Sequence, residues 1–136
     1  MFPNDANFLV VDDSGAVRTL VKQQLNGLGF RNVLEAESGQ ATLDKLESLQ
    51  KANVQIHLLI VDWNMPGISG LDLLQNLKNS AKFKGIPFLM ITSESETEKV
   101  IKAIVHGVAD FLVKPFDEEV LSQKLTAIWK RTRHNP

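Results

Sequence analysis

The stretch HLLIVDWNMPGISG, residues 57–70, runs from apolar residues straight into a carboxylate and then a turn. Four apolar residues, 58–61, lead directly to Asp62, and Trp63, Asn64, a proline and two glycines follow within the stretch. An apolar run without polar alternation is typical of a parallel strand that is covered on both faces. The stretch therefore predicts a buried strand that places Asp62 at its carboxyl end.

Similar apolar runs recur along the chain and alternate with stretches of helical spacing. The expected strands are FLVV (8–11), NVLEA (32–36), LLIV (58–61), IPFLMI (86–91) and DFLV (110–113). The second run is the most polar, so we expect it at an edge of the sheet. Apolar residues at helical spacing mark helices within residues 17–28, 41–49, 71–77, 100–108 and 120–129. Ser14 is the expected N-cap of the first helix, and the fourth is expected to stop near Gly107.

Five strand–helix alternations predict an α/β fold with a doubly wound five-stranded parallel sheet. The length of 136 residues fits one domain, with a core of about residues 7–130. The chain has no cysteine, which excludes disulfides and thiolate metal sites. Its 15 basic and 16 acidic residues argue against nucleic acid or a membrane surface as a partner. With no apolar run of about 20 residues and no signal-peptide pattern, we expect a cytoplasmic protein.

Polar side chains stand where the expected strands end. Known doubly wound proteins supply the strand order 2-1-3-4-5, in which strands 1, 3, 4 and 5 are neighbours. Each polar residue alone also fits a turn, a loop or a helix start. Together they predict one crevice at the carboxyl ends of the strands, formed by Asp12, Asp13, Asp62, Thr92, Ser93 and Lys114.

The charges in this crevice indicate its chemistry. Three close carboxylates repel and raise one another's pKa unless a cation is present. Mg²⁺ suits them, because it prefers oxygen ligands and is typically held by a few carboxylates and a phosphate oxygen. The carboxylate of Asp62 can act as a nucleophile and form an acyl phosphate. Lys114 and the hydroxyl of Thr92 would then meet the charge of the phosphoryl group.

Four motifs, FLVVDDS, LLIVDWNMPGISGLDLL, IPFLMITSE and ADFLVKPF, resemble the receiver domains of two-component response regulators. The resemblance extends from Phe8 to about Trp129. Within the family the chain is most similar to CheY-type chemotaxis regulators, through DWNMP and through ending after the fifth helix. The resemblance implies the flavodoxin-like fold of CheY, which is itself one of the proteins for which the strand order 2-1-3-4-5 is known.

The resemblance also implies roles for single residues. Asp62 would be the phosphoacceptor, with Thr92 hydrogen-bonding the phosphoryl group and Lys114 pairing with it. Mg²⁺ would be held by the three carboxylates and the backbone carbonyl of Asn64. The Lys114–Pro115 peptide bond is often cis in this family. Further roles would fall to the following residues: Phe111 with Thr92 in the switch, Asn64 and Glu94 in tuning dephosphorylation, and Lys99, Lys102, His106, Phe111 and Gln123 on the output surface.

As a whole, the resemblance implies a phosphorylation-activated signalling protein that is not an enzyme beyond its own phosphotransfer and dephosphorylation. Its expected partners are a histidine kinase as phosphodonor, a downstream target such as the flagellar motor switch, and in some systems a phosphatase. Met1 and the early end favour a complete, stand-alone chain, which we expect to be a monomer. Alternatives within the class are a single-domain phosphorelay intermediate and a receiver module of a larger regulator.

Two rival classes share part of this pattern. A haloacid-dehalogenase-like phosphatase needs a second Asp two residues after its nucleophile as general acid, and Asn64 at that position disfavours it. A flavodoxin-like flavin carrier needs a first loop that cradles phosphate, and the acidic VDDSG would repel one. Residues 43–56 form a longer segment than receivers usually have, so we expect an extended second helix or a longer loop there. Trp63 is expected to point away from the metal.

Overall fold

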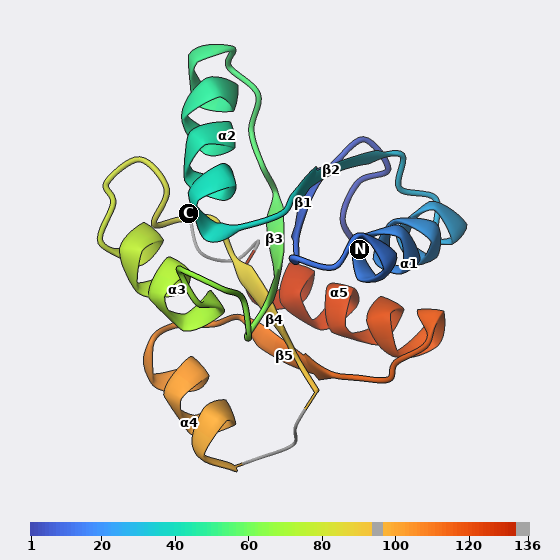
Figure 1. Ribbon diagram of the computed structural model, residues 1–136. Coiled ribbons are helices and arrows are strands. Elements are labelled where there is room, and N and C mark those ends of the chain that lie inside the picture. Colours follow the sequence, from blue (N-terminus) through green and yellow to red (C-terminus); the bar gives the residue numbers. More distant parts are fainter. Residues whose placement is uncertain (94–96, 133–136) are drawn as a thin grey trace.

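Five parallel strands form one sheet in the order β2-β1-β3-β4-β5 (Figure 1). The structure, a computed structural model, describes residues 1–93 and 97–132, without the side chains of Thr97, Lys99 and Val100. The predicted doubly wound α/β class is confirmed, as are its strand order and the edge position of β2. The elements are β1 (Asn7–Val11), α1 (Gly15–Gly27), β2 (Asn32–Ala36), α2 (Gly39–Lys51), β3 (Leu58–Asp62), α3 (Gly70–Lys78), β4 (Phe88–Thr92), α4 (Thr97–Val105), β5 (Asp110–Val113) and α5 (Glu118–Thr132).

Helices cover both faces of the sheet (Figure 1). One apolar cluster joins α1 and α5 to the sheet, and a second joins α2 and α3 to the opposite face. Successive side chains of a strand point to opposite faces, so Leu58 and Ile60 enter the first cluster while Leu59 and Val61 enter the second. All five residues of β3 are buried. This explains why the run ahead of Asp62 shows no polar alternation.

Of the helix starts that the structure describes, those of α1, α2 and α3 have a serine cap. The hydroxyls of Ser14, Ser38 and Ser69 each accept a hydrogen bond from the backbone N–H three residues later, at 3.3, 3.0 and 3.1 Å. Such a cap satisfies one of the N–H groups that a helix start leaves unpaired. The cap predicted at Ser14 is confirmed. The predicted stop of α4 is also confirmed, because Gly107 has a left-handed φ of 93° just after the helix.

β4 differs from its predicted bounds of 86–91. The strand begins at Phe88, because Pro87 has no N–H to contribute to the ladder, although its carbonyl accepts a bond from Leu59 at 3.0 Å. It then continues to Thr92, which pairs with Val113 of β5. Thr92 is therefore a strand residue, held by the ladder, and not the first residue of a loop.

The segment 43–56 is taken up mainly by helix. α2 continues to Lys51, and residues 52–57 lead from it to β3. Asn53 has a left-handed φ of 58°, a conformation that asparagine tolerates at a helix end. Among the described residues, no helix is long and apolar enough to cross a membrane.

Candidate functional site

Two neighbouring strands bring three carboxylates together. Val11 of β1 pairs with Val61 of β3, so Asp12 and Asp62, the next residues on each strand, emerge side by side at the carboxyl edge of the sheet. Asp13 follows directly on the chain. One carboxylate oxygen from each residue lies within 4.8 Å of the others. Asp12 and Asp62 are buried, while Asp13 is exposed.

Lys114 reaches this cluster from the end of β5. Its Nζ lies 3.3 Å from Asp62 Oδ1 and 3.7 Å from Asp12 Oδ2. Its backbone N–H donates to the carbonyl of Thr92 at 2.7 Å, which fixes the start of the side chain against β4. The peptide bond between Lys114 and Pro115 is cis, in agreement with the resemblance. Among the described residues, one ammonium therefore pairs with two of the three carboxylates.

Burial and charge leave the cluster short of positive charge. Burial is the main cause that raises the pKa of Asp12, and the Ser14 N–H bond at 2.9 Å and Lys114 oppose it. Burial also raises the pKa of Asp62, followed by repulsion from Asp12, again against the attraction of Lys114. Asp12 Oδ2 is buried without a hydrogen-bond partner among the described residues. Buried polar atoms normally have a hydrogen-bond partner or contact an ion. A cation bound to the cluster would give this oxygen such a contact.

The donor set fits a hard divalent cation. The carboxylates of Asp12, Asp13 and Asp62 can hold a metal ion, since each offers one oxygen within reach of the others. Oxygen ligands of this kind suit Mg²⁺. Asn64 is exposed in the loop that follows β3, so its predicted part in binding through the backbone carbonyl stays a prediction.

The loop after Asp62 is held close to the strand. The N–H of Gly70 donates to the carbonyl of Trp63 at 2.9 Å, and Met65 is buried beneath the loop. A Cβ on Gly70 would collide with the backbone carbonyl of Asp62 and with Trp63 Cα. Only glycine allows α3 to begin this close to the acceptor. Trp63 itself is partly buried and packs against the cluster beneath α2 and α3.

The predicted switch residues stand on neighbouring strands. Thr92 is 3% exposed at the end of β4, and Phe111 is partly buried on β5, next to Met90 in the ladder. Nζ of Lys124 lies 4.9 Å from the centre of the Phe111 ring, within cation–π range. Lys124 also contacts Asp110 Oδ1 at 3.2 Å. An ammonium on α5 thus covers the ring that the resemblance assigns to the switch.

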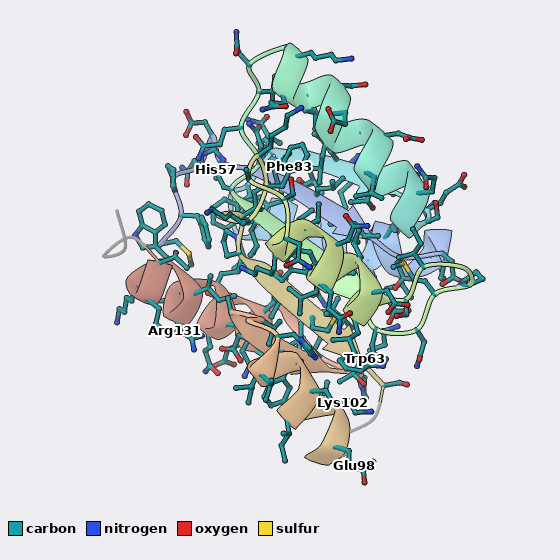
Figure 2. The ribbon with its side chains drawn as sticks, turned by 90° about the vertical axis from the view of Figure 1, so that its left-hand side faces the viewer. His57, Trp63, Phe83, Glu98, Lys102 and Arg131 are labelled. Carbon is teal, nitrogen blue, oxygen red and sulfur yellow. The ribbon has the colours of Figure 1, made fainter. Side chains whose placement is uncertain are left out.

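The predicted output residues are only partly described. Lys102, His106 and Gln123 are exposed, and Lys102 stands on α4 in Figure 2. His106 Nε2 lies 3.3 Å from the side-chain nitrogen of Gln75. Glu94 and the side chain of Lys99 lie outside the described residues.

Helix α4 is where the apolar pattern misleads. Ile101, Ile104 and Val105 helped to mark the helix, yet they are 53%, 59% and 73% exposed, and among the described side chains of α4 Ala103 is the buried one. The apolar periodicity correctly predicted a helix, but it did not predict which side of α4 packs against the sheet. The result is an apolar surface beside β5.

Sequence reasoning did not single out two charged groups, one beside the site and one at the start of β5. Arg18 on α1 donates to the backbone carbonyl of Asp12 at 2.6 Å and pairs with Glu35 of β2 at 3.1 Å. Asp110 accepts from both Lys124 and Arg131, the latter at 2.9 Å. Arg18 lies one turn after Ser14 on the predicted helix, so its spacing from the Asp pair was the available signal.

Comparison with known proteins places the chain in a family. The model of the response regulator receiver domain matches residues 8–126. The chain belongs to this family, whose members are signalling proteins and not enzymes in the usual sense.

Among curated relatives, the chain is similar to proteins of the CheY group. It is 44% identical over 120 residues to the chemotaxis protein CheY1 of Helicobacter pylori, covering 88% of this chain and 94% of the relative. It is 42% identical over 123 residues to CheY-3 of Vibrio cholerae, covering 90% of this chain and 91% of the relative. The predicted resemblance to CheY-like receivers is confirmed.

Solved structures of response regulators have the same fold as this chain. CheY4 of Vibrio cholerae matches with a TM-score of 0.80 at 32% identity, covering 91% of this chain and 98% of that structure. A response regulator of Chloroflexus aurantiacus matches with a TM-score of 0.81 at 29% identity, covering 93% and 99%.

Proposed function

We propose that this chain is a CheY-like chemotaxis response regulator that accepts a phosphoryl group on Asp62. The observation that carries the proposal is the meeting of a buried carboxylate, a lysine 3.3 Å away and two further carboxylates at one edge of the sheet. The family match and the chemotaxis proteins among its relatives support the same function. The single receiver domain would comprise residues 1–136.

The transfer is a displacement at phosphorus. An oxygen of Asp62 attacks the phosphorus of a phosphohistidine on the kinase, a P–O bond forms and the P–N bond breaks. The imidazole leaves with the electron pair of that bond and takes a proton. Lys114, whose Nζ lies 3.3 Å from Asp62 Oδ1, would balance the negative charge on the phosphoryl oxygens. The hydroxyl of Thr92 would donate a hydrogen bond to the phosphoryl group.

Asp12, Asp13 and Asp62, with the carbonyl of Asn64, would hold Mg²⁺. When bound, the ion supplies charge neutralisation for the acidic cluster and for a phosphoryl group. Asn64 and Glu94 are proposed to tune the hydrolysis that returns Asp62 to its free carboxylate, which implies a water as the attacking group.

Signal output would depend on Thr92 and Phe111. A phosphoryl group on Asp62 gives Thr92 a new partner, and Phe111 then packs inward, which requires its ring to leave the ammonium of Lys124. A two-state equilibrium of this kind is biased by phosphorylation and not created by it. The apolar side chains exposed on α4 next to β5 give this output surface a contact area for a protein target.

The proposed partners are a histidine kinase as donor and the flagellar motor switch as target, with a phosphatase where one exists. Residues Lys99, Lys102, His106, Phe111 and Gln123 are the proposed polar and aromatic part of the target surface. A cytoplasmic, monomeric protein suits these partners.

The proposal is tested with acetyl phosphate and Mg²⁺. The wild type should gain one hydroxylamine-sensitive phosphoryl group by mass spectrometry, and Asp62→Asn should gain none. Asp44→Asn, which removes an exposed carboxylate on α2, is the matched control and should be phosphorylated normally. Phosphate retained on Asp62→Asn would refute the assignment. Metal binding is read separately in a Trp129→Phe variant, where Mg²⁺ should quench the emission of Trp63 even without a phosphodonor.

A further inference from the structure

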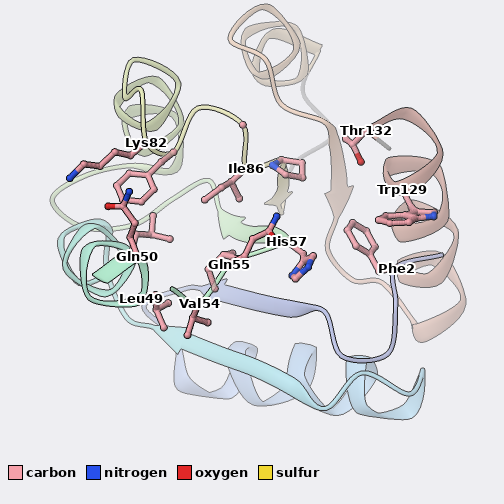
Figure 3. A pocket seen from close by; sticks show the side chains of 15 residues that line it. Phe2, Leu49, Gln50, Val54, Gln55, His57, Lys82, Ile86, Trp129 and Thr132 are labelled. Atoms are coloured by element: carbon pink, nitrogen blue, oxygen red, sulfur yellow. The ribbon is translucent and has the colours of Figure 1, made fainter. Parts of the chain in front are cut away.

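A cavity opens at the edge of the sheet opposite the acidic cluster (Figure 3). Its volume is about 650 Å³, within the range of small-molecule sites. It lies where strands begin: His57 directly precedes β3 and Pro87 directly precedes β4. His57 and Asp62 are separated by the length of β3, about 16 Å at the usual rise per residue. The cavity is thus distinct from the phosphoacceptor site.

The walls are largely apolar and come from four parts of the chain. Phe2 and Trp129 form an aromatic wall, with ring centres 5.2 Å apart. The facing wall is aliphatic and belongs to the segment 43–56, including Leu49 and Val54. Figure 3 shows His57 between these two walls. The long segment that the proposed function does not use therefore contributes six of the fifteen residues that line this cavity.

His57 presents one fixed hydrogen-bond donor. Its Nδ1 accepts the backbone N–H of Asn7 at 3.0 Å, and its own backbone N–H donates to the carbonyl of Asn7 at 2.8 Å. Because Nδ1 accepts, the proton of the neutral ring lies on Nε2. Among the described residues, Nε2 makes no hydrogen bond, so this N–H is available to a molecule in the cavity.

The lining carries little charge. Among the described residues, Lys82 is the one lining side chain of fixed charge, and its Nζ is paired with Glu47 at 3.5 Å. It stands at the far end from Trp129 in Figure 3. An anion would gain no free cation here, whereas an uncharged apolar molecule would cover aromatic and aliphatic walls at once.

We propose that this cavity binds an uncharged, largely apolar small molecule with two ring groups joined by a carbonyl. One ring packs against Phe2 and Trp129, the other against Leu49 and Val54, and the carbonyl oxygen accepts the Nε2–H of His57. The site is independent of phosphorylation at Asp62, so it would hold even if the proposed function failed.

Two model compounds of similar size test the donor. Benzophenone has the carbonyl, and diphenylmethane replaces it with a methylene group. In NMR titrations of the ¹⁵N-labelled protein, the indole N–H signal of Trp129 should shift saturably with benzophenone. The signal of Trp63, at the other edge of the sheet, serves as the internal control and should not move. Benzophenone should bind roughly three- to tenfold more tightly than diphenylmethane, the effect of one neutral hydrogen bond.

A pair of variants in one loop tests the location. Val54→Phe should crowd the aliphatic wall of the cavity, where one ring is proposed to pack, and weaken benzophenone binding at least tenfold, while Ala52→Phe, exposed in the same loop but not lining the cavity, should leave it unchanged. Both positions are exposed, and urea unfolding checks that both variants fold. Equal affinity for the two compounds, equal shifts of both indoles, or unaltered binding to Val54→Phe would each overturn the proposal. So would a shift of Trp129 on dilution without any compound, since a second copy would then occupy the cavity.

Discussion

Replacement of Asp62 by Asn should stabilise the protein when divalent metal is absent. The carboxylate is 7% exposed and stands beside a second buried carboxylate. In the described part of the chain, one ammonium, that of Lys114, opposes these charges. Asn keeps the approximate shape of the side chain and removes its charge, so the variant isolates the electrostatic cost of the acceptor.

The size of the effect follows from the distances. At an effective dielectric constant of about 20, charges that lie within 4.8 Å of each other repel by at least about 3.5 kcal/mol. The attraction of Lys114 at 3.3 Å is about 5 kcal/mol on the same scale. Repulsion from Asp12, with a smaller and solvent-screened share from Asp13, largely offsets it. The burial of an ion costs several kcal/mol, and most of this cost remains. We therefore expect a gain of about 1–3 kcal/mol in the free energy of unfolding.

The gain should depend on pH with a defined sign. Burial and Asp12 raise the pKa of Asp62 above its ordinary value of 3.8. The folded wild type then binds a proton more readily than the unfolded chain, so its stability increases as the pH falls through the raised pKa. The advantage of Asp62→Asn should be complete above that pKa and should shrink as the pH approaches 3.8.

Urea unfolding in EDTA, followed by circular dichroism at pH 7 and at lower pH, measures this difference. Asp44→Asn is the control for loss of one negative charge and should change the free energy of unfolding by less than about 0.5 kcal/mol. Saturating Mg²⁺ should stabilise the wild type more than the variant, because only binding to the folded state adds stability. An Asp62→Asn protein no more stable than the wild type in EDTA at pH 7 would refute the reasoning.

Two further predictions concern the backbone near the acceptor and the exposed side of α4. Gly70→Ala should lower the free energy of unfolding by about 1–3 kcal/mol, since its Cβ meets the backbone of Asp62, whereas Gly85→Ala meets no atom within 4 Å and should change little; equal urea midpoints for the two variants would contradict this. Ile104→Ser should leave stability within about 0.5 kcal/mol of the wild type, because the side chain is exposed, yet weaken binding of the phosphorylated protein to its target in a calorimetric titration. A large loss of stability there would show that Ile104 belongs to the core.

The fold could be predicted from the sequence because its strongest signals are local and repeated. The unbroken run before Asp62 reports burial on both faces, which the structure shows for all of β3. Parallel strands end at the same edge of the sheet, so polar residues that follow them lie at that edge. For this reason the proximity of Asp12 and Asp62 could be predicted from the sequence. The order of the strands came from known folds and not from these residues.

The sequence did not predict the contacts that long side chains make between elements. It also did not predict which side of α4 is buried against the sheet. Lys124 reaches Phe111 from another element, and no spacing along the chain encodes that contact. Ile101 and Ile104 have the helical period of a buried stripe, but burial depends on where α4 sits against the sheet. Arg18 likewise acts on a backbone carbonyl, which any residue at position 12 would offer.

β3 behaves as a spacer of fixed length between the two edges of the sheet. Because its side chains alternate between faces, insertion or deletion of a single residue within it would turn the terminal carboxylate to the other face. Variation in chain length must therefore be absorbed elsewhere, and the loop that contains the left-handed Asn53 offers such a place. Homologous chains that gain or lose residues before this strand can remodel one edge while the geometry of Asp62 is preserved.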